Sequence, residues 1–128
     1  MRLRSLIVDD NGNFLAAARN LLEREGIEVV GGAATGAEAL ALAQELRPDV
    51  ALVDIDLGDE SGFDVAQRLV ETLGAESVVL ISSYAERDFA DLIAASPAVG
   101  FLSKSDLSAR NIYEVLGLTG AEGSTDPG

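Results

Sequence analysis

Short apolar runs alternate along this chain with longer segments in which apolar residues recur at helical spacing. The short runs predict five strands, at residues 3–8, 28–33, 49–54, 77–82 and 99–103. The longer segments predict five helices, which follow the strands one by one and end near positions 25, 46, 73, 95 and 116. Strict alternation of strand and helix predicts an α/β fold with a parallel sheet and helices on both of its faces.

Local signals mark the ends of several predicted helices. Thr35 and Glu38 have the spacing of a capping box at the start of the second helix. Gly26 supplies a stop for the first helix, and Pro97 prevents the fourth, which starts near residue 86, from continuing. Ser108 is placed to cap the last helix.

The third apolar run has the character of a central strand. Residues 49–54, DVALVD, are apolar between the terminal aspartates, as expected for a strand that is covered on both faces. A polar loop rich in glycine, residues 57–62, follows it. Beyond residue 117 the sequence has no periodicity, so we expect one domain over residues 1–117 and a flexible tail or linker start at 118–128.

Polar residues collect where the predicted strands end. The set comprises Asp9 and Asp10 after the first strand, Asp54 and Asp56 at the third, Ser82 and Ser83 at the fourth, and Lys104 after the fifth. The carboxyl ends of parallel strands meet at one edge of a sheet, where such folds bind their ligands. Single aspartates often close strands as turn residues, but a set at four strand ends favours a functional site.

The composition narrows the chemistry of that site. The 128 residues include 22 acids and nine bases, and the net charge of −13 argues against direct binding of nucleic acid. The chain has no cysteine and no histidine, so thiolate and imidazole chemistry is excluded and a metal ion must be held by oxygen atoms. Lys104 is the only lysine.

Three carboxylates at one edge need positive charge. Like charges about 4 Å apart repel by roughly 4 kcal/mol at an effective dielectric of about 20. Mg²⁺ suits an all-oxygen cluster of Asp9, Asp10 and Asp54, and Lys104 can add a second positive charge. Together they predict a site for a phosphoryl group, with Asp54 as the nucleophile and Ser82 as a hydrogen-bond donor.

No apolar run of about 18 residues suggests a membrane span. The apolar start of the chain is cut short by Asp9 and Asp10, which argues against a signal peptide. We therefore expect a soluble cytoplasmic protein without a membrane partner.

Four motifs in order resemble the receiver domain of two-component response regulators. They are LIVDD at residues 6–10, DVALVDIDL at 49–57, VVLISS at 78–83 and GFLSK at 100–104, and the resemblance covers residues 3–116. It implies a flavodoxin-like, doubly wound sheet of five parallel strands in the order 2-1-3-4-5, with five helices. It also implies a phosphoprotein that serves in phosphorelay signal transduction.

The resemblance assigns a role to each site residue. It implies that Asp54 accepts the phosphoryl group and that Asp10 and Asp54 bind Mg²⁺ directly. Asp9 would hold water ligands of the ion, and the backbone carbonyl of Asp56 would complete the protein ligands. Ser82 and Lys104 would contact the phosphoryl oxygens.

Further positions in the resemblance concern switching. Phe101 matches the aromatic residue that turns inward when the hydroxyl residue, here Ser82, moves toward the phosphate. Ser83 and Tyr84 lie next to the site, and Tyr84, like Asp56, matches a position that influences phosphoryl lifetime. Ser105 follows the lysine where many members of the family have a proline, so no cis peptide bond is expected there.

The expected partners follow from the same resemblance. A sensor histidine kinase would be the donor, and the face formed by the fourth helix, fifth strand and fifth helix would switch its affinity for an output partner. The ending GFLSK, without proline, looks most like regulators with a helix-turn-helix DNA-binding output, in transcription regulation. Whether the chain acts alone or belongs to a longer protein, and whether it forms a homodimer on phosphorylation, stays open.

Two other interpretations remain open from the sequence. The pair Asp54 and Asp56 resembles the nucleophile motif of haloacid-dehalogenase-like phosphohydrolases, although those enzymes carry it on their first strand. The chain could also be a degenerate receiver that serves only as an interaction module. The complete acidic set favours a working receiver that is not itself an enzyme.

Overall fold

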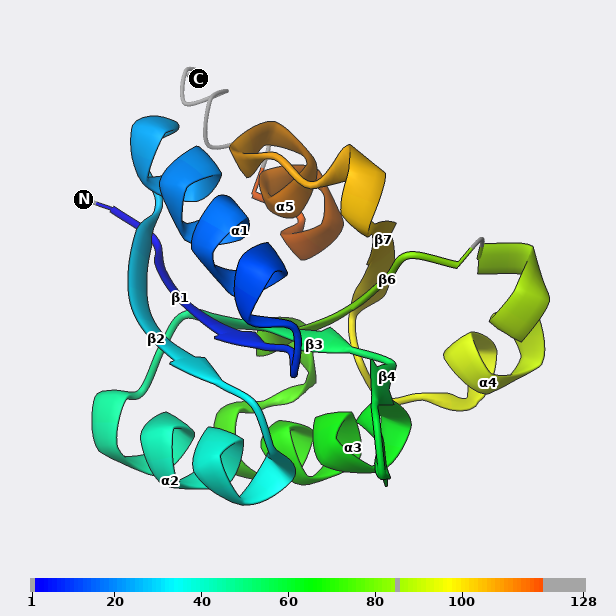
Figure 1. Ribbon diagram of the computed structural model, residues 1–128. Coiled ribbons are helices and arrows are strands. Elements are labelled where there is room, and N and C mark those ends of the chain that lie inside the picture. The colour runs from blue at the N-terminus through cyan, green and yellow to red at the C-terminus, as the bar shows by residue number, and fades with distance from the viewer. Residues whose placement is uncertain (1, 85, 119–128) are drawn as a thin grey trace.

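The computed structural model describes residues 2–84 and 86–118, and Figure 1 shows a central sheet between two layers of helices. Among these residues, five parallel strands form the sheet in the order β2-β1-β3-β6-β7. The strands are β1 (Arg4–Val8), β2 (Glu28–Ala33), β3 (Val50–Asp54), β6 (Val78–Ser82) and β7 (Gly100–Ser103). This order confirms the predicted doubly wound arrangement, with β3 at its centre.

Two long helices lie on each face of the sheet, and a short helix lies beside its edge. Helices α1 (Gly12–Arg24) and α5 (Ala109–Leu116) lie on one face, and α2 (Gly36–Leu46) and α3 (Gly62–Leu73) lie on the other (Figure 1). The short α4 (Ala90–Ala95) projects beside the β6–β7 edge and has no fully buried residue. Helix α4 is therefore less buried than α1, α2, α3 and α5, each of which has at least two buried residues.

Alternate residues of the strands feed two separate cores. In β3, Ala51 and Val53 pack with α2 and α3, whereas Val50 and Leu52 pack with α1 and α5, and all four are fully buried. A strand that is buried on both faces carries apolar residues at consecutive positions, which explains the unbroken run in the sequence. The register of the neighbouring strands then brings their carboxyl ends to one edge.

The predicted capping residues bind at the helix starts, with one difference. The Thr35 side chain accepts a hydrogen bond from the Glu38 amide at 3.2 Å, as in a capping box, but a Glu38 carboxylate oxygen accepts its hydrogen bond from the Ala34 amide, at 2.8 Å, one residue before the expected donor. Ser108 caps α5 by accepting a hydrogen bond from the Asn111 amide at 3.0 Å. These side chains satisfy amides that have no partner within their helices.

Two segments differ from the sequence prediction. The predicted loop at residues 57–62 contains a small antiparallel hairpin of β4 (Asp56–Leu57) and β5 (Glu60–Ser61), in which Gly58 turns the chain at a φ of +76°. The predicted fourth helix begins as a 3₁₀ segment, η2 (Glu86–Phe89), before α4. The other 3₁₀ turns are η1 (Ala75–Ser77) and η3 (Lys104–Asp106).

Three further expectations concern the backbone and the chain ends. No peptide bond of the described residues is cis, as expected for Ser105 after the lysine. No helix within the described ranges is both long enough and apolar enough to cross a bilayer. Of the tail expected at 118–128, positions 119–128 lie outside the described residues.

Candidate functional site

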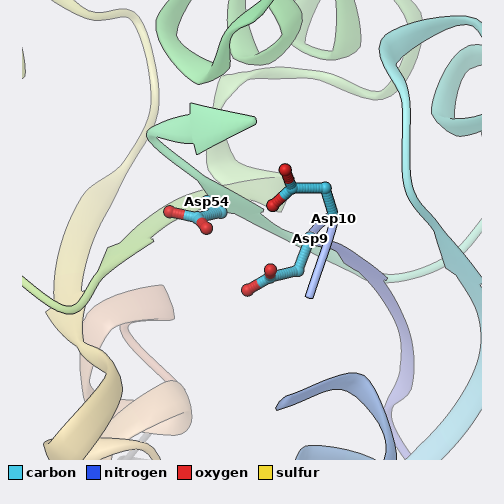
Figure 2. A group of neighbouring side chains, drawn as sticks. All are labelled: Asp9, Asp10 and Asp54. Carbon is cyan, nitrogen blue, oxygen red and sulfur yellow. The ribbon is translucent and has the colours of Figure 1, made fainter. Parts of the chain in front are cut away.

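Three aspartates meet at the carboxyl edge of the sheet. Asp9 and Asp10 follow β1 and Asp54 is the last residue of β3. One carboxylate oxygen from each lies within 4.8 Å of the others, and Figure 2 shows the three side chains gathered above the strand ends. Asp9 is fully buried and Asp54 is 5% exposed, whereas Asp10 faces solvent. The arrangement confirms that parallel strands bring these carboxylates together.

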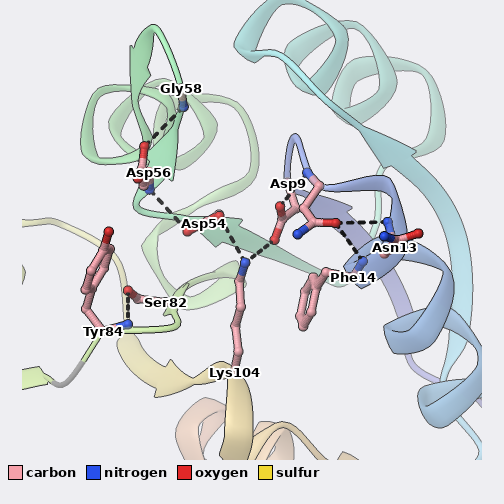
Figure 3. A network of polar contacts seen from close by, with 10 residues as sticks. Asp9, Asn13, Phe14, Asp54, Asp56, Gly58, Ser82, Tyr84 and Lys104 are labelled. Atoms are coloured by element: carbon pink, nitrogen blue, oxygen red, sulfur yellow. Dashed lines mark hydrogen bonds and ion pairs between the residues drawn. The ribbon is translucent and has the colours of Figure 1, made fainter.

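Lys104 reaches this cluster from the end of β7. Its Nζ lies 2.7 Å from Asp9 Oδ2 and 3.2 Å from Asp54 Oδ2 (Figure 3). Burial alone lowers the pKa of Lys104, but the adjacent carboxylates of Asp9 and Asp54 outweigh that effect and raise it. The ammonium therefore stays charged and partly compensates the acidic cluster.

The environment of Asp54 favours its protonated form. Burial is the largest cause of a raised pKa at this carboxyl, and the Asp9 charge adds to it. A hydrogen bond from the Asp56 amide to Asp54 Oδ1 at 3.1 Å and the charge of Lys104 oppose the rise without cancelling it. The pKa of Asp54 therefore stays above its ordinary value, although both carboxylate oxygens have a hydrogen-bond donor.

The carboxylates fit a hard divalent cation. Asp9 Oδ1 accepts a hydrogen bond from the Asn11 amide at 2.8 Å, but Asp9 Oδ2 is buried and no well-aligned hydrogen bond reaches it, despite its close ion pair with Lys104. A buried carboxylate oxygen in that state can still accept a hydrogen bond, for example from a water ligand of a metal ion. The all-oxygen donor set of Asp9, Asp10 and Asp54 suits Mg²⁺ in its chemistry.

The hydroxyl residue and its neighbours lie on the adjacent strand. Ser82, the buried last residue of β6, follows Ile81, which pairs with Asp54 in the sheet. Its Oγ accepts a hydrogen bond from the Tyr84 amide at 2.9 Å (Figure 3), and Ser83 between them is exposed. The sequence thus placed these residues at the correct edge.

The aromatic residues divide between the site edge and the core. Tyr84 is 49% exposed, and its ring centroid lies 5.6 Å from that of Phe89. Phe101, on β7, is half-buried against the core on the α2 and α3 face. Tyr84 therefore packs beside the end of η2, whereas Phe101 packs against the core.

The segment after Asp54 is held at two points. Gly62, the first residue of α3, packs directly on the backbone of Asp54 and donates its amide hydrogen to the Ile55 carbonyl at 2.9 Å. In the hairpin, Glu60 Oε1 accepts a hydrogen bond from the Gly36 amide at the N-terminus of α2, at 2.8 Å. These contacts fix the backbone of Asp56 next to the carboxylate cluster.

Two site residues were missed by sequence reasoning. Phe14 received no role in the sequence analysis, but its ring centroid lies 4.3 Å from the Lys104 ammonium. Glu60 was part of a predicted loop and received no role. Position 14 lies four residues after Asp10, near the start of the first helix. This closeness to the acidic pair was the only feature of the sequence that could have pointed to a place for Phe14 near the site.

The sequence matches the model of a known protein family over most of its length. The response regulator receiver domain model matches residues 5–116. The chain belongs to this family. The chain is 31% identical over 103 residues to the response regulator GacA of Pseudomonas aeruginosa, across 80% of this chain and 48% of that protein. It is 27% identical over 104 residues to the DNA-binding transcriptional activator EvgA of Escherichia coli, across 81% of this chain and 51% of that protein.

Solved receiver structures resemble this receiver domain closely. A response regulator protein from Burkholderia pseudomallei, solved with a phosphorylated aspartic acid, calcium ion and citrate, is 27% identical with a TM-score of 0.77, over 96% of this chain and 71% of that one. The signal receiver domain of NarL from Mycobacterium tuberculosis is 31% identical with a TM-score of 0.75, over 91% of this chain and 94% of that one. The receiver domain spans about half the length, or less, of the curated relatives it matches.

Proposed function

We propose that this receiver domain accepts a phosphoryl group on Asp54 from a sensor histidine kinase and switches partner binding in a phosphorelay. The observation that carries the proposal is the meeting of the Asp54 carboxylate with Asp9, Asp10 and the Lys104 ammonium at one sheet edge. The phosphorylated aspartic acid of the Burkholderia relative supports it. The chain itself would be a substrate of phosphoryl transfer and not an enzyme.

The transfer needs one nucleophile and charge neutralisation. A carboxylate oxygen of Asp54 attacks the phosphorus of a phosphohistidine, and an O–P bond forms as the P–N bond breaks. The imidazole nitrogen leaves with the bonding electrons and takes up a proton from solvent, so the product is an acyl phosphate on Asp54. Lys104, whose Nζ lies 3.2 Å from Asp54 Oδ2, would pair with the phosphoryl oxygens.

The same carboxylates would hold Mg²⁺. Asp10 and Asp54 would bind it directly, Asp9 through water ligands, and Asp56 through its backbone carbonyl. The ion, when bound, would neutralise negative charge on the phosphoryl oxygens. The partly satisfied Asp9 Oδ2 and the backbone contacts that fix residues 56–62 support this assignment.

The outward signal would start at Ser82. Its Oγ accepts the Tyr84 amide hydrogen in this structure, and its own hydroxyl would donate to a phosphoryl oxygen on Asp54. That movement would open space into which the half-buried Phe101 ring turns inward. The surface of α4, β7 and α5, where Leu92 and Val99 are exposed, would then change its affinity for a partner.

The neighbours of the site would set how long the phosphoryl group persists. Tyr84 is half-exposed beside Ser82, Asp56 is exposed beside Asp54, and Ser83 lies at the solvent side of the same turn. Side chains there control the access of water to the acyl phosphate. We assign Asp56, Ser83 and Tyr84 this role.

The partner would be an output protein or a DNA-binding output domain outside residues 1–117. The relatives GacA and EvgA, a response regulator and a DNA-binding transcriptional activator, support a role in transcription regulation. With a net charge of −13 the chain would not bind nucleic acid itself. The kinase and the domain would meet in the cytoplasm, and residues 118–128 would serve as tail or linker.

Phosphorylation by acetyl phosphate with Mg²⁺ tests the proposal. Intact mass spectrometry should show the addition of one phosphoryl group to the natural protein and none to Asp54→Ala. Asp59→Ala, which alters an exposed aspartate in the hairpin turn, is the matched control and should be labelled normally. Labelling of Asp54→Ala would refute the assignment of the acceptor.

Two other outcomes would favour the rival functions. Sustained release of phosphate from small phosphate esters would identify a phosphohydrolase. Partner binding that is retained in a protein that cannot be phosphorylated would identify an interaction module. The place of Asp54 at the end of the third strand along the chain, and not the first, argues against the phosphohydrolase.

A further inference from the structure

The Lys104 ammonium has a neighbour that is not a carboxylate. Asp9 and Asp54 approach it at 2.7 Å and 3.2 Å, and the face of the Phe14 ring approaches it with the centroid at 4.3 Å (Figure 3). A cation within about 6 Å of an aromatic face is attracted by the electron-rich ring. We propose that Phe14 is a positioning residue that holds the Lys104 ammonium over the Asp9 and Asp54 carboxylates.

One capping structure sets both Asp9 and Phe14. The Asn11 amide donates to Asp9 Oδ1 at 2.8 Å, and the Asn11 side-chain oxygen accepts the Phe14 amide hydrogen at 3.2 Å as it caps α1. The loop between β1 and α1 thereby fixes the carboxylate and the ring relative to each other. Lys104, 90 residues further along the chain, extends from η3 into the place that they form.

The chemistry of a ring suits this position. A lysine side chain has four rotatable bonds, and a fixed location for its ammonium must offset the entropy lost on ordering it. A third carboxylate would fix the ammonium but would add negative charge to an already acidic cluster. The Phe14 ring attracts the cation without carrying a formal charge. It also leaves the N–H groups of the Lys104 ammonium free to donate to oxygen atoms.

The contact matters most when the carboxylates change partners. This step rests on the proposed function, in which Mg²⁺ and a phosphoryl group engage Asp9 and Asp54. The ammonium then loses carboxylate contacts, whereas the ring remains in place. Phe14 would keep Lys104 near the phosphoryl oxygens during transfer.

The single lysine of the chain permits a direct test. Protein grown with ¹³C-labelled lysine gives one set of lysine side-chain signals, all from Lys104. A ring face near the ammonium shifts the Cε protons upfield. Phe14→Leu should move them back toward their position in a flexible peptide, and Phe14→Tyr, which keeps the ring, should leave them as in the natural protein.

A matched control separates the ring contact from general packing. Phe63→Leu makes the same change at another half-buried phenylalanine, whose ring pairs with Phe89, and it should leave the lysine signals unchanged. An unchanged spectrum in Phe14→Leu would overturn the proposal. A lysine shift in Phe63→Leu equal to that in Phe14→Leu would overturn it as well, because the effect would then be structural.

Phosphorylation rates supply the second measurement. With acetyl phosphate and saturating Mg²⁺, Phe14→Leu should be labelled about three- to ten-fold more slowly than the natural protein, and Phe14→Tyr should be close to normal. A normal rate in Phe14→Leu would overturn the role in transfer. If the natural protein is not labelled at all, the proposed function fails, and the lysine spectra still decide where Phe14 holds the ammonium.

Discussion

Gly62 packs on the backbone of Asp54 so closely that no side chain fits between them. A Cβ atom added to Gly62 would lie 1.8 Å from the Asp54 carbonyl oxygen and 2.5 Å from the Ile55 Cα. Both obstacles are backbone atoms, one of the phosphoacceptor candidate and one of the residue that follows it, so no rotamer change can relieve the clash. The start of α3 and the end of β3 are therefore placed by one close contact.

Gly62→Ala should destabilise the fold strongly. The added methyl group must push α3 away from β3, and we expect a loss of about 3 kcal/mol or more in the free energy of unfolding. Urea denaturation followed by circular dichroism measures it. Gly12→Ala is the control, since nothing lies within 4 Å of an added Cβ there, and its midpoint should not fall. Equal midpoints for the two variants would show that the contact is not restrictive.

Lys104→Met should strengthen Mg²⁺ binding. The ammonium lies 2.7 Å from Asp9 Oδ2 and competes with a cation for the same negative charge. Its removal should raise the Mg²⁺ affinity by at least about three-fold, measured by titration calorimetry. Arg110→Met removes a charge from an exposed side chain on α5 and should leave the affinity within about two-fold. Weaker binding in Lys104→Met would contradict competition.

Asp54→Asn should stabilise the metal-free protein at neutral pH. Burial raises the pKa of Asp54, so the native state holds its proton more tightly than the unfolded chain does. Above that pKa the ionised carboxylate lowers stability, and an uncharged amide avoids the loss. The gain should shrink as the pH falls through the raised pKa. Thermal melts from pH 7 downward measure it, and a gain that does not change with pH would contradict this account.

Glu60→Ala should loosen the hairpin from α2. It removes the carboxylate that accepts the Gly36 amide hydrogen at 2.8 Å, and a loss of about 1 kcal/mol is expected, as for a helix cap. Glu45→Ala, an exposed glutamate on α2, is the matched control and should change stability by less than about 0.5 kcal/mol. Hydrogen exchange should quicken at the Gly36 amide in Glu60→Ala. Unchanged exchange there would argue that solvent replaces the carboxylate without loss.

The parallel sheet, and most of the residues at its carboxyl edge, could be predicted from the sequence. Residues 49–54 predicted a central strand because burial on both faces requires apolar residues at consecutive positions. Because the strands are parallel, Asp9, Asp54 and Lys104 were expected at the same edge, and the structure brings them into contact although Asp9 and Lys104 are 95 residues apart. A topological rule, and not local propensity, made that prediction possible.

Features that depend on short elements or single side-chain contacts could not be predicted. The strands at residues 56–57 and 60–61 are two residues long, too short for a period to show. The 3₁₀ turn at residues 86–89 has a composition that also suits an α-helix. Phe14 looked like any apolar residue on a helix face, because only the tertiary fold brings Lys104 against its ring.

The three clustered carboxylates have a consequence for the protein as a whole. They face a single ammonium, so folding without a cation concentrates excess negative charge at one edge. A divalent ion that binds only the folded state adds RT ln(1 + [Mg²⁺]/Kd) to the free energy of unfolding. The fraction of folded molecules, and their resistance to proteases, should thus vary with the free magnesium concentration, independently of any phosphoryl transfer.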